Sequence, residues 1–137
     1  KSDPSDLSRI NLTDDADAIA AKIRRAKTDS APLPDTLAAL EARPEAENLV
    51  GIYAALSGGS QLEVLTEFSG KGFGELKPRL TDLLVERLAP VSAAMRRLMT
   101  DPAEIDRILA DGAERARALA APTLEDTKRI VGFWRRT

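Results

Sequence analysis

The sequence contains no cysteine and no histidine. The first absence excludes disulfides, thiolate metal sites and thiol chemistry within this chain, and the second excludes a histidine-ligated metal. Together they exclude a Ser–His or Cys–His nucleophile, so a hydrolase is not expected. No apolar run approaches the ~20 residues that a membrane span requires, so we expect a soluble chain.

The chain also lacks an excess of positive charge. Its 20 lysine and arginine residues face 22 aspartate and glutamate residues, so nucleic-acid binding would have to come from local clusters. Three basic clusters are present: Lys22, Arg24, Arg25 and Lys27; Arg96 and Arg97; and Lys128, Arg129, Arg135 and Arg136.

Strand-forming patterns are scarce, whereas helical spacing is frequent. Valine, isoleucine and threonine are few beside alanine and leucine, and no long stretch alternates with period two. At 137 residues and 43% apolar content, the chain is long enough for one domain with a core. We therefore predict an all-α bundle of five to seven helices, preceded by a flexible loop.

The first helix is predicted over 14–27, because apolar residues recur there at helical spacing and Thr13 is a suitable N-cap. Acidic residues suit its positive end: Asp14, Asp15 and Asp17. Two prolines and polar residues in 28–43 predict a loop, with a short helical turn over 36–40.

Two helices joined by a glycine turn are predicted next. Pro44 at a first helical position begins a helix that Gly58-Gly59 ends. Ser60 and Glu63 have the spacing of a capping box and begin a short helix that continues through Phe68.

A glycine-rich stretch, Gly70-Lys71-Gly72-Phe73-Gly74, follows this helix. A phosphate-binding P-loop needs a strand before it and Lys-Ser/Thr after its last glycine, whereas here the lysine lies between glycines and a helix precedes. We interpret the stretch as a sharp corner between helices, with Phe73 packed into the core.

The longest predicted helix covers 76–98, and Pro90 is expected to kink or break it. Asp101 then predicts an N-cap, with Pro102 in the first turn and Glu104 reaching back to the cap. The next helix carries apolar residues on one face: Ile105, Ile108, Leu109, Ala116, Leu119 and Ala120.

Pro122 and Thr123 predict a further boundary, followed by a final helix that includes Val131 and Trp134. Trp134 falls on the apolar stripe of Val131, so we interpret it as a core residue rather than a stacking platform.

Seven short segments occur in a characteristic order: residues 10–15, 26–29, 47–53, 56–58, 70–74, 76–77 and 106–113. This ordered set resembles the tryptophanyl-tRNA synthetases, a family of class I aminoacyl-tRNA synthetases, over the part from the KMSKS signature to the C-terminus. Lys1 and Ser2 match the last two residues of that signature. The preceding Lys-Met-Ser is missing, and residues 31–43 look unlike the family.

This resemblance implies a catalytic role for Lys1 and an ATP-binding role for Lys1 and Ser2. In the family the KMSKS loop closes over ATP, with Mg²⁺, while the tryptophan carboxylate attacks the α-phosphate. A mobile ammonium placed against the phosphates stabilises charge that grows in the transition state. Ser2 is expected to donate a hydrogen bond to the loop or the nucleotide. No metal-ligating residue is predicted in this chain.

The resemblance also implies that residues 13–137 form a helical domain that cradles the anticodon stem of tRNA(Trp). Basic side chains neutralise RNA phosphates, and the candidates for such contacts are Arg135, Arg136, Lys22 and Arg24. The competing interpretation is that Lys22 and Arg24 complement the helix dipole and that the basic C-terminus is simply solvated.

We expect the chain to be a fragment, because no initiator methionine precedes Lys1 and residues 1–12 look like the remnant of the KMSKS loop and a linker. The HIGH motif of the family needs histidine, so the fragment alone is expected to be inactive. The parent enzyme is expected to be a cytoplasmic homodimer that joins tryptophan to its tRNA, without binding DNA or membrane. A free-standing helical RNA-binding module and a protein-interaction module remain the alternatives.

Overall fold

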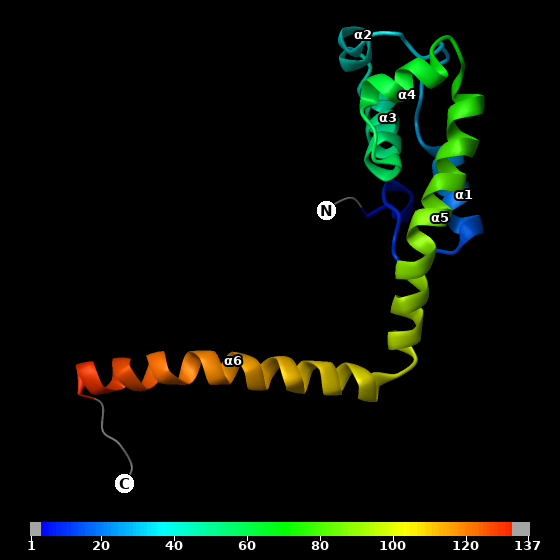
Figure 1. Ribbon diagram of the computed structural model, residues 1–137. Coiled ribbons are helices and arrows are strands. Elements are labelled where there is room, and N and C mark those ends of the chain that lie inside the picture. The colour runs from blue at the N-terminus through cyan, green and yellow to red at the C-terminus, as the bar shows by residue number, and fades with distance from the viewer. Residues whose placement is uncertain (1–3, 133–137) are drawn as a thin grey trace. The chain divides into compact units, whose positions relative to one another are not determined.

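A computed structural model describes residues 4–132 of the chain. These residues form six α-helices and one 3-10 turn, and no β-strand occurs among them (Figure 1). The elements are η1 Asp6–Ser8, α1 Ala16–Arg25, α2 Leu37–Glu41, α3 Pro44–Ser57, α4 Gln61–Phe68, α5 Phe73–Met99 and α6 Pro102–Val131. The predicted all-α class and the predicted number of helices are confirmed.

The chain divides into two compact units, Lys1–Met95 and Arg96–Thr137, so the boundary lies inside α5. The first unit contains η1, α1 to α4 and most of α5, and the second contains the end of α5 and all of α6. The predicted division into residues 1–12 and 13–137 stays a prediction.

The hydrophobic core belongs to the first unit. Helices α1 to α5 each contribute to it, and the loop before α2 adds Leu33. The α3 and α4 helices pack against each other, and Tyr53 meets Phe68 edge to face with ring centroids 5.4 Å apart. The side chains of Leu76 and Leu80, on the first half of α5, are completely buried. The last buried apolar side chain on α5 is Leu84, and beyond it Ser92 is the one buried residue described on this helix.

The α1 helix begins at Ala16, and its N-cap is Asp15 rather than the predicted Thr13. The Asp15 carboxylate accepts a hydrogen bond from the backbone N–H of Ala18 at 2.8 Å. A carboxylate at the N-cap also stabilises the positive end of the helix, which explains why aspartate takes the position. Asp14, which was also predicted to stabilise the positive end of this helix, instead binds the ammonium of Lys22.

The glycine turn between α3 and α4 is confirmed. Gly58 ends α3 in the left-handed region at φ 78°, a conformation that costs glycine no Cβ clash. Ser60 and Glu63 then form the predicted capping box, with Ser60 Oγ accepting from the Glu63 N–H and Glu63 accepting from the Ser60 N–H. Both ends of the connection are therefore fixed by local sequence.

The glycine-rich corner before α5 is also confirmed as a structural element. Gly70 has φ 72°, and Phe73 is buried at the first position of α5. The corner pairs with the loop before α2, because the Leu33 N–H donates to the Lys71 carbonyl at 2.8 Å and the Gly70 N–H donates to the Leu33 carbonyl at 3.0 Å. Leu33 is thereby held in the core.

The helix boundary predicted at Pro122 is wrong: α6 continues through this proline, and residues 124–131 belong to α6. The α5 helix also continues through Pro90, so no break occurs there, and the alternative of a kink at Pro90 stays a prediction. A proline removes a single backbone hydrogen bond, and the turns on both sides of each proline keep the helical path. Trp134 lies outside the described residues.

The start of α6 is as predicted except for Glu104. The Asp101 carboxylate accepts from the Glu104 N–H at 3.1 Å, which makes Asp101 the N-cap. The Glu104 carboxylate, however, binds the Arg107 guanidinium at 2.8 Å instead of reaching back to the cap. The Glu104 carboxylate therefore pairs with Arg107 one turn later in the helix, and this ion pair replaces the predicted capping box.

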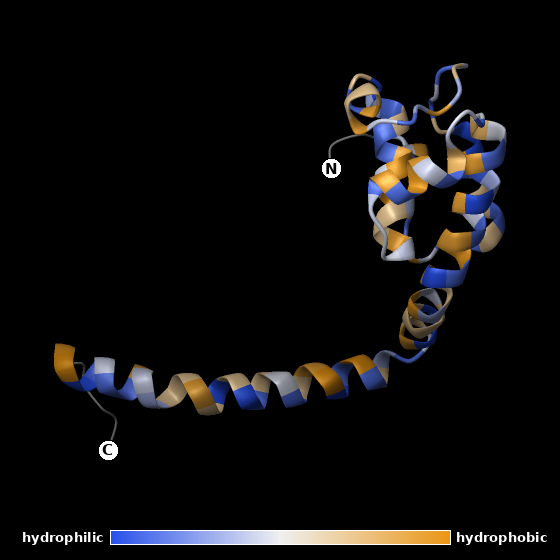
Figure 2. Cartoon of the chain, turned by 45° about the horizontal axis from the view of Figure 1, so that its top comes forward, coloured by the Kyte–Doolittle hydropathy of each residue, from blue (hydrophilic) through white to orange (hydrophobic). Residues whose placement is uncertain are grey.

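No described residue of α6 is buried. Figure 2 shows apolar and polar residues in alternation along the helix, and the predicted apolar face is present but exposed. The charged residues form ion pairs one turn apart, as in Arg115 with Asp111 and Arg129 with Asp126. In both pairs the acid precedes the base, the order that favours a helix.

Replacing a core leucine of the first unit and a surface leucine of the second will show how much each contributes to the free energy of unfolding. Leu80→Ala should lower the free energy of unfolding by about 2–5 kcal/mol, because it opens a cavity in a fully buried site. Leu119→Ala, on an α6 side chain that is 81% exposed, should change it by less than about 0.5 kcal/mol. Chemical denaturation of the 137-residue chain measures both, and equal losses would contradict this location of the core.

Candidate functional site

The predicted site residues fall into three groups in the structure. Lys1 and Ser2, predicted to act on ATP, lie outside the described residues, as do Arg135 and Arg136. Lys22 and Arg24 are described, and both lie on α1 in the first unit. The described part of the predicted site is therefore the surroundings of Lys22 and Arg24 on α1.

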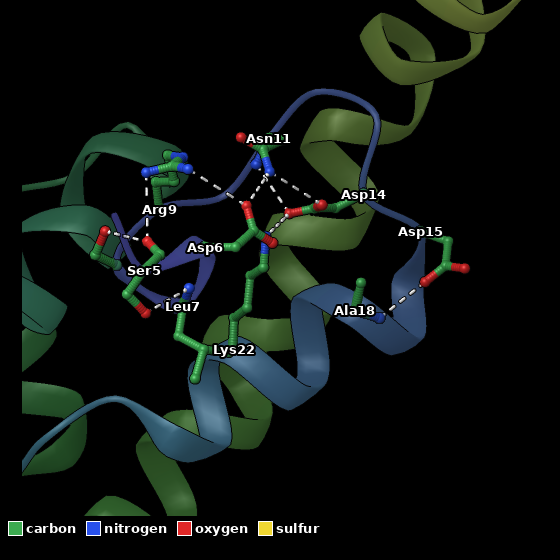
Figure 3. Close-up of polar contacts among 10 residues, drawn as sticks. Ser5, Asp6, Leu7, Arg9, Asn11, Asp14, Asp15, Ala18 and Lys22 are labelled. Atoms are coloured by element: carbon green, nitrogen blue, oxygen red, sulfur yellow. Dashed lines mark hydrogen bonds and ion pairs between the residues drawn. The ribbon is translucent and has the colours of Figure 1, made fainter. Parts of the chain in front are cut away.

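Lys22 is buried, with a side chain only 6% exposed, although lysine is rarely found inside proteins without a partner. Its ammonium binds the Asp14 carboxylate at 2.6 Å and the Asp6 carboxylate at 2.9 Å (Figure 3). The ammonium is therefore occupied by two carboxylates of the same chain. This geometry favours a structural role over the predicted RNA contact.

Asn11 completes the arrangement around Lys22. Its side-chain amide donates to Asp6 Oδ1 at 2.8 Å, and its backbone N–H donates to Asp14 Oδ2 at 2.8 Å. The Asp14 N–H returns a bond to the Asn11 carbonyl at 3.0 Å, which closes a turn just before α1. We call Asp6, Asn11, Asp14 and Lys22 the N-terminal clasp, because together they tie residues 6–14 to α1.

The local sequence explains why these groups meet. Lys22 shares the buried face of α1 with Ile19 and Ile23, so its long stem packs with the core while its ammonium emerges beyond it. Asp14 lies in the turn before the helix, and its side chain is 11% exposed. Asp6 opens η1, whose N-cap Ser5 accepts from the Leu7 N–H at 3.2 Å.

The clasp shifts the pKa values of its charged members in the directions that keep them ionised. Burial opposes ionisation of Asp14, but hydrogen bonds from Lys22 and Asn11 outweigh it and lower the Asp14 pKa. The hydrogen bond from Lys22, and then that from Asn11, lowers the pKa of Asp6. The hydrogen bonds to Asp14 and Asp6 raise the pKa of Lys22.

Arg24 differs from Lys22 in being exposed. It borders an open pocket of about 550 Å³ between α1 and the first turns of α5. The pocket is lined by Ala20, Arg24, Phe73, Gly74, Lys77, Pro78, Thr81 and Asp82. Within residues 4–132 no carboxylate forms an ion pair with Arg24, so its guanidinium remains available to an anion.

The C-terminal carbonyls of α1 are satisfied by Lys77 from α5. Its ammonium donates to the Ala26 carbonyl at 2.8 Å and to the Arg24 carbonyl at 3.3 Å. A cation at this position also complements the negative end of the helix dipole. Sequence analysis assigned that role to the basic residues of α1 itself and missed Lys77, because no local signal connects residues fifty positions apart.

Arg43 was also missed by the sequence prediction. Its side chain binds the loop before α2, part of which lies in residues 31–43, the stretch that looked unlike the family. Its guanidinium binds both carboxylate oxygens of Asp29 and donates to the carbonyls of Pro32 at 2.6 Å and Ala31 at 3.0 Å. It also lies over the Phe73 ring, 5.8 Å from the centroid. One side chain thus links the loop, the start of α3 and the start of α5.

Neither a metal site nor a membrane span emerges from the part of the chain that the structure describes. Between residues 4 and 132, no three acidic side chains are grouped so that they could hold a metal ion. No helix in that range is both long and apolar enough to cross a membrane.

The basic residues at the end of α6, Lys128 and Arg129, form ion pairs with Glu125 and Asp126.

Comparison with known proteins identifies close relatives. The chain is 61% identical over 134 residues to a tryptophan--tRNA ligase of Caulobacter vibrioides and 57% identical over 135 residues to that of Agrobacterium fabrum. It is 41% identical over 140 residues to the chloroplastic/mitochondrial tryptophan--tRNA ligase of Arabidopsis thaliana. These matches cover 98%, 98% and 99% of the chain but only 39%, 38% and 33% of the relatives. No protein-family model matches the chain.

The clasp predicts an acid-sensitive contribution to stability. A carboxylate whose folded-state pKa is lowered stabilises the fold above its unfolded pKa of about 4, and this contribution is lost as the pH falls through the lowered value. Asp14→Asn should therefore lower the melting temperature at pH 7, and the difference from the unmodified chain should shrink from pH 4 downward. Thermal unfolding between pH 7 and pH 2.5 measures this difference.

Asp126→Asn is the control, because this α6 carboxylate pairs with Arg129 on an exposed helix surface. Its melting temperature should stay close to that of the unmodified chain at every pH. A constant difference between Asp14→Asn and the unmodified chain across the whole range would contradict the assigned pKa shift.

Proposed function

We propose that this chain, whose sequence belongs to the tryptophan--tRNA ligase family, is the C-terminal part of an enzyme that activates tryptophan with ATP and transfers it to tRNA(Trp). The observation that carries the proposal is 61% identity over 98% of the chain to a named ligase. Because the chain spans about two fifths of the length of its curated relatives, the activity is proposed for the larger protein. A cytoplasmic location and a homodimeric parent enzyme are part of the same proposal.

In this proposal Lys1 and Ser2 act on ATP. A lysine ammonium beside the phosphates stabilises the negative charge that develops while the tryptophan carboxylate attacks the α-phosphate and pyrophosphate leaves. The Ser2 hydroxyl holds the loop or the nucleotide by a hydrogen bond. Mg²⁺ enters with the ATP phosphates as part of the substrate.

The helical body contacts tRNA in this proposal. Arg24 is the described residue best suited to a phosphate, since it is exposed and borders the pocket between α1 and α5. Arg135 and Arg136 complete the proposed contacts on the basis of sequence alone. Lys22 is withdrawn from this group, because its ammonium is held by Asp6 and Asp14.

The alternative of a free-standing RNA-binding or protein-interaction module is not favoured, since the relatives compared here are ligases by name. The first test is tryptophan-dependent exchange of pyrophosphate into ATP. The full-length protein that contains this chain should catalyse exchange, whereas the isolated 137-residue chain should give no rate above background. Robust exchange by the isolated chain would show that activation does not need the larger protein.

A second test addresses the RNA contacts in the full-length protein. Arg24→Ala should raise the KM for tRNA and reduce the salt dependence of tRNA binding by about one unit of slope, as expected for one lost phosphate contact. The double variant Arg135→Ala/Arg136→Ala should reduce the slope by about two units. Tryptophan activation should be unchanged in both variants.

Arg24→Lys is the matched control, because it keeps the positive charge at the same place on α1 and should retain most of the salt dependence. Unchanged tRNA kinetics and an unchanged slope in the alanine variants would remove these arginines from the RNA-binding surface.

A further inference from the structure

The α6 helix carries an apolar face along its whole length. At 3.6 residues per turn, an arc of roughly 120° of its surface holds no charged side chain between Pro102 and Val131. We call this arc the α6 apolar face; its larger members and its one glycine are Ile105, Leu109, Gly112, Leu119, Ile130 and Val131. The Leu119 side chain is 81% exposed and that of Ile130 is 80% exposed. Such a continuous apolar surface marks a site of contact with another element.

The charged side chains of α6 are paired with one another elsewhere on the helix. In the described part of α6, five ion pairs join residues about one turn apart: Glu104 with Arg107, Asp111 with Arg115, Glu114 with Arg117, Glu125 with Lys128 and Asp126 with Arg129. By the same helical spacing, all of these side chains lie outside the α6 apolar face. The charged side of the helix is therefore suited to water as it stands, whereas the apolar face leaves large side chains in water.

Gly112 lies within the α6 apolar face, and the helix itself gives no reason for a glycine there. Its φ is not positive, and a helix-interior glycine lowers the helix–coil equilibrium constant about four- to fivefold relative to alanine. Among residues 4–132, a Cβ at this position would meet no atom within 4 Å beyond its own helix backbone. Glycine in a helix is useful where another element approaches the backbone closely. Gly112 therefore points to a close approach by a partner of α6.

The spacing of the apolar residues separates two kinds of partner. Two copies of α6 wound around each other would need an apolar seam that repeats every 3.5 residues. The heptad seam that contains Ile105, Leu109 and Leu119 also contains Asp126, so it would place a carboxylate between the two helices. The α6 apolar face instead follows 3.6 residues per turn and runs straight along the helix, which suits the surface of a globular domain.

The larger protein of the proposed function has room for such a domain. The chain spans 39% of the ligase of Caulobacter vibrioides and 38% of that of Agrobacterium fabrum, so more than half of each relative lies outside the match. The 30 residues of α6 extend over about 45 Å, which is long enough to cross one face of a domain.

We propose that the α6 apolar face docks against the part of the polypeptide that lies outside this chain, with Gly112 at the point of closest approach. This inference rests on the proposed function, in which the chain is the C-terminal part of a larger protein. The surface that covers α6 is apolar, because the α6 apolar face presents no charged group to it.

Amide hydrogen exchange of residues 105–131, followed by mass spectrometry, tests the docking. It is measured in the 137-residue chain and in the full-length protein that contains it. Because docking makes local opening of α6 less favourable, these amides should exchange at least 10-fold more slowly in the full-length protein. Equal exchange in the two proteins would overturn the proposal.

Sedimentation of the 137-residue chain over a range of concentrations tests the other occupant, a second copy. We expect a monomer. A dimer in which α6 is protected as strongly as in the full-length protein would assign the α6 apolar face to a second copy and would overturn docking on the larger protein.

Two neighbouring substitutions test which side of α6 is covered. Leu119→Glu places a carboxylate on the α6 apolar face, and Ala118→Glu, the matched control, places one at an exposed position on the opposite side. In the full-length protein, Leu119→Glu should remove most of the 10-fold protection of α6, whereas Ala118→Glu should retain it. In the 137-residue chain, neither should change exchange by more than about twofold. Equal effects of the two substitutions in the full-length protein would contradict docking through this face.

Gly112→Ala should act in opposite directions in the two proteins. In the 137-residue chain, alanine should slow exchange of the surrounding amides about four- to fivefold, because it is the better helix former. In the full-length protein, the added methyl group should obstruct the close approach and make exchange faster. Ala118→Gly is the control and should make exchange faster in both. Slower exchange in both proteins with Gly112→Ala would overturn the close approach at this glycine.

Tryptophan-dependent exchange of pyrophosphate into ATP, measured on the same full-length protein, separates the two proposals. Absence of this activity would refute the proposed function. An active full-length protein with an unprotected α6 would overturn the docking alone.

Discussion

Burial of one face of the first half of α5 is the constraint on which the first unit depends. Leu76 and Leu80 are completely buried, and Leu84 is nearly so, at successive turns of the same helix. The other helices of the unit contribute their apolar faces to the same core. With only five aromatic residues in the chain, this core is built mainly from leucine, isoleucine and valine, and the Tyr53–Phe68 contact is its single described aromatic pair.

Long basic side chains hold the connecting segments to this core. Lys22 secures the segment before α1, Lys77 caps the end of α1, and Arg43 binds the loop before α2. Each of them reaches a carboxylate or a backbone carbonyl of another segment. Such bonds are directional, so they define the path of a loop in a way that apolar packing alone does not.

Basic residues that are neighbours in the sequence lie in different environments. In α1, Lys22 and Arg24 are two positions apart, yet one is buried between carboxylates and the other is exposed beside a pocket. At the end of α6, Lys128 and Arg129 each have a carboxylate one turn earlier. A cluster of positive charge in the sequence therefore contains residues with and without an internal partner, and the ion pairs tell them apart.

Local signals in the sequence were sufficient for the helical class, the glycine turn at Gly58, the capping box of α4 and the corner at Gly70, because each depends on residues within a few positions of one another. The family resemblance likewise followed from short ordered segments. Pro122 misled the prediction of a helix boundary, since one missing hydrogen bond does not end a helix whose neighbouring turns are intact. The clasp around Lys22, the cap by Lys77 and the loop contacts of Arg43 were decided by the tertiary structure, because they join groups that no local spacing pattern links and that meet only after the chain has folded back on itself.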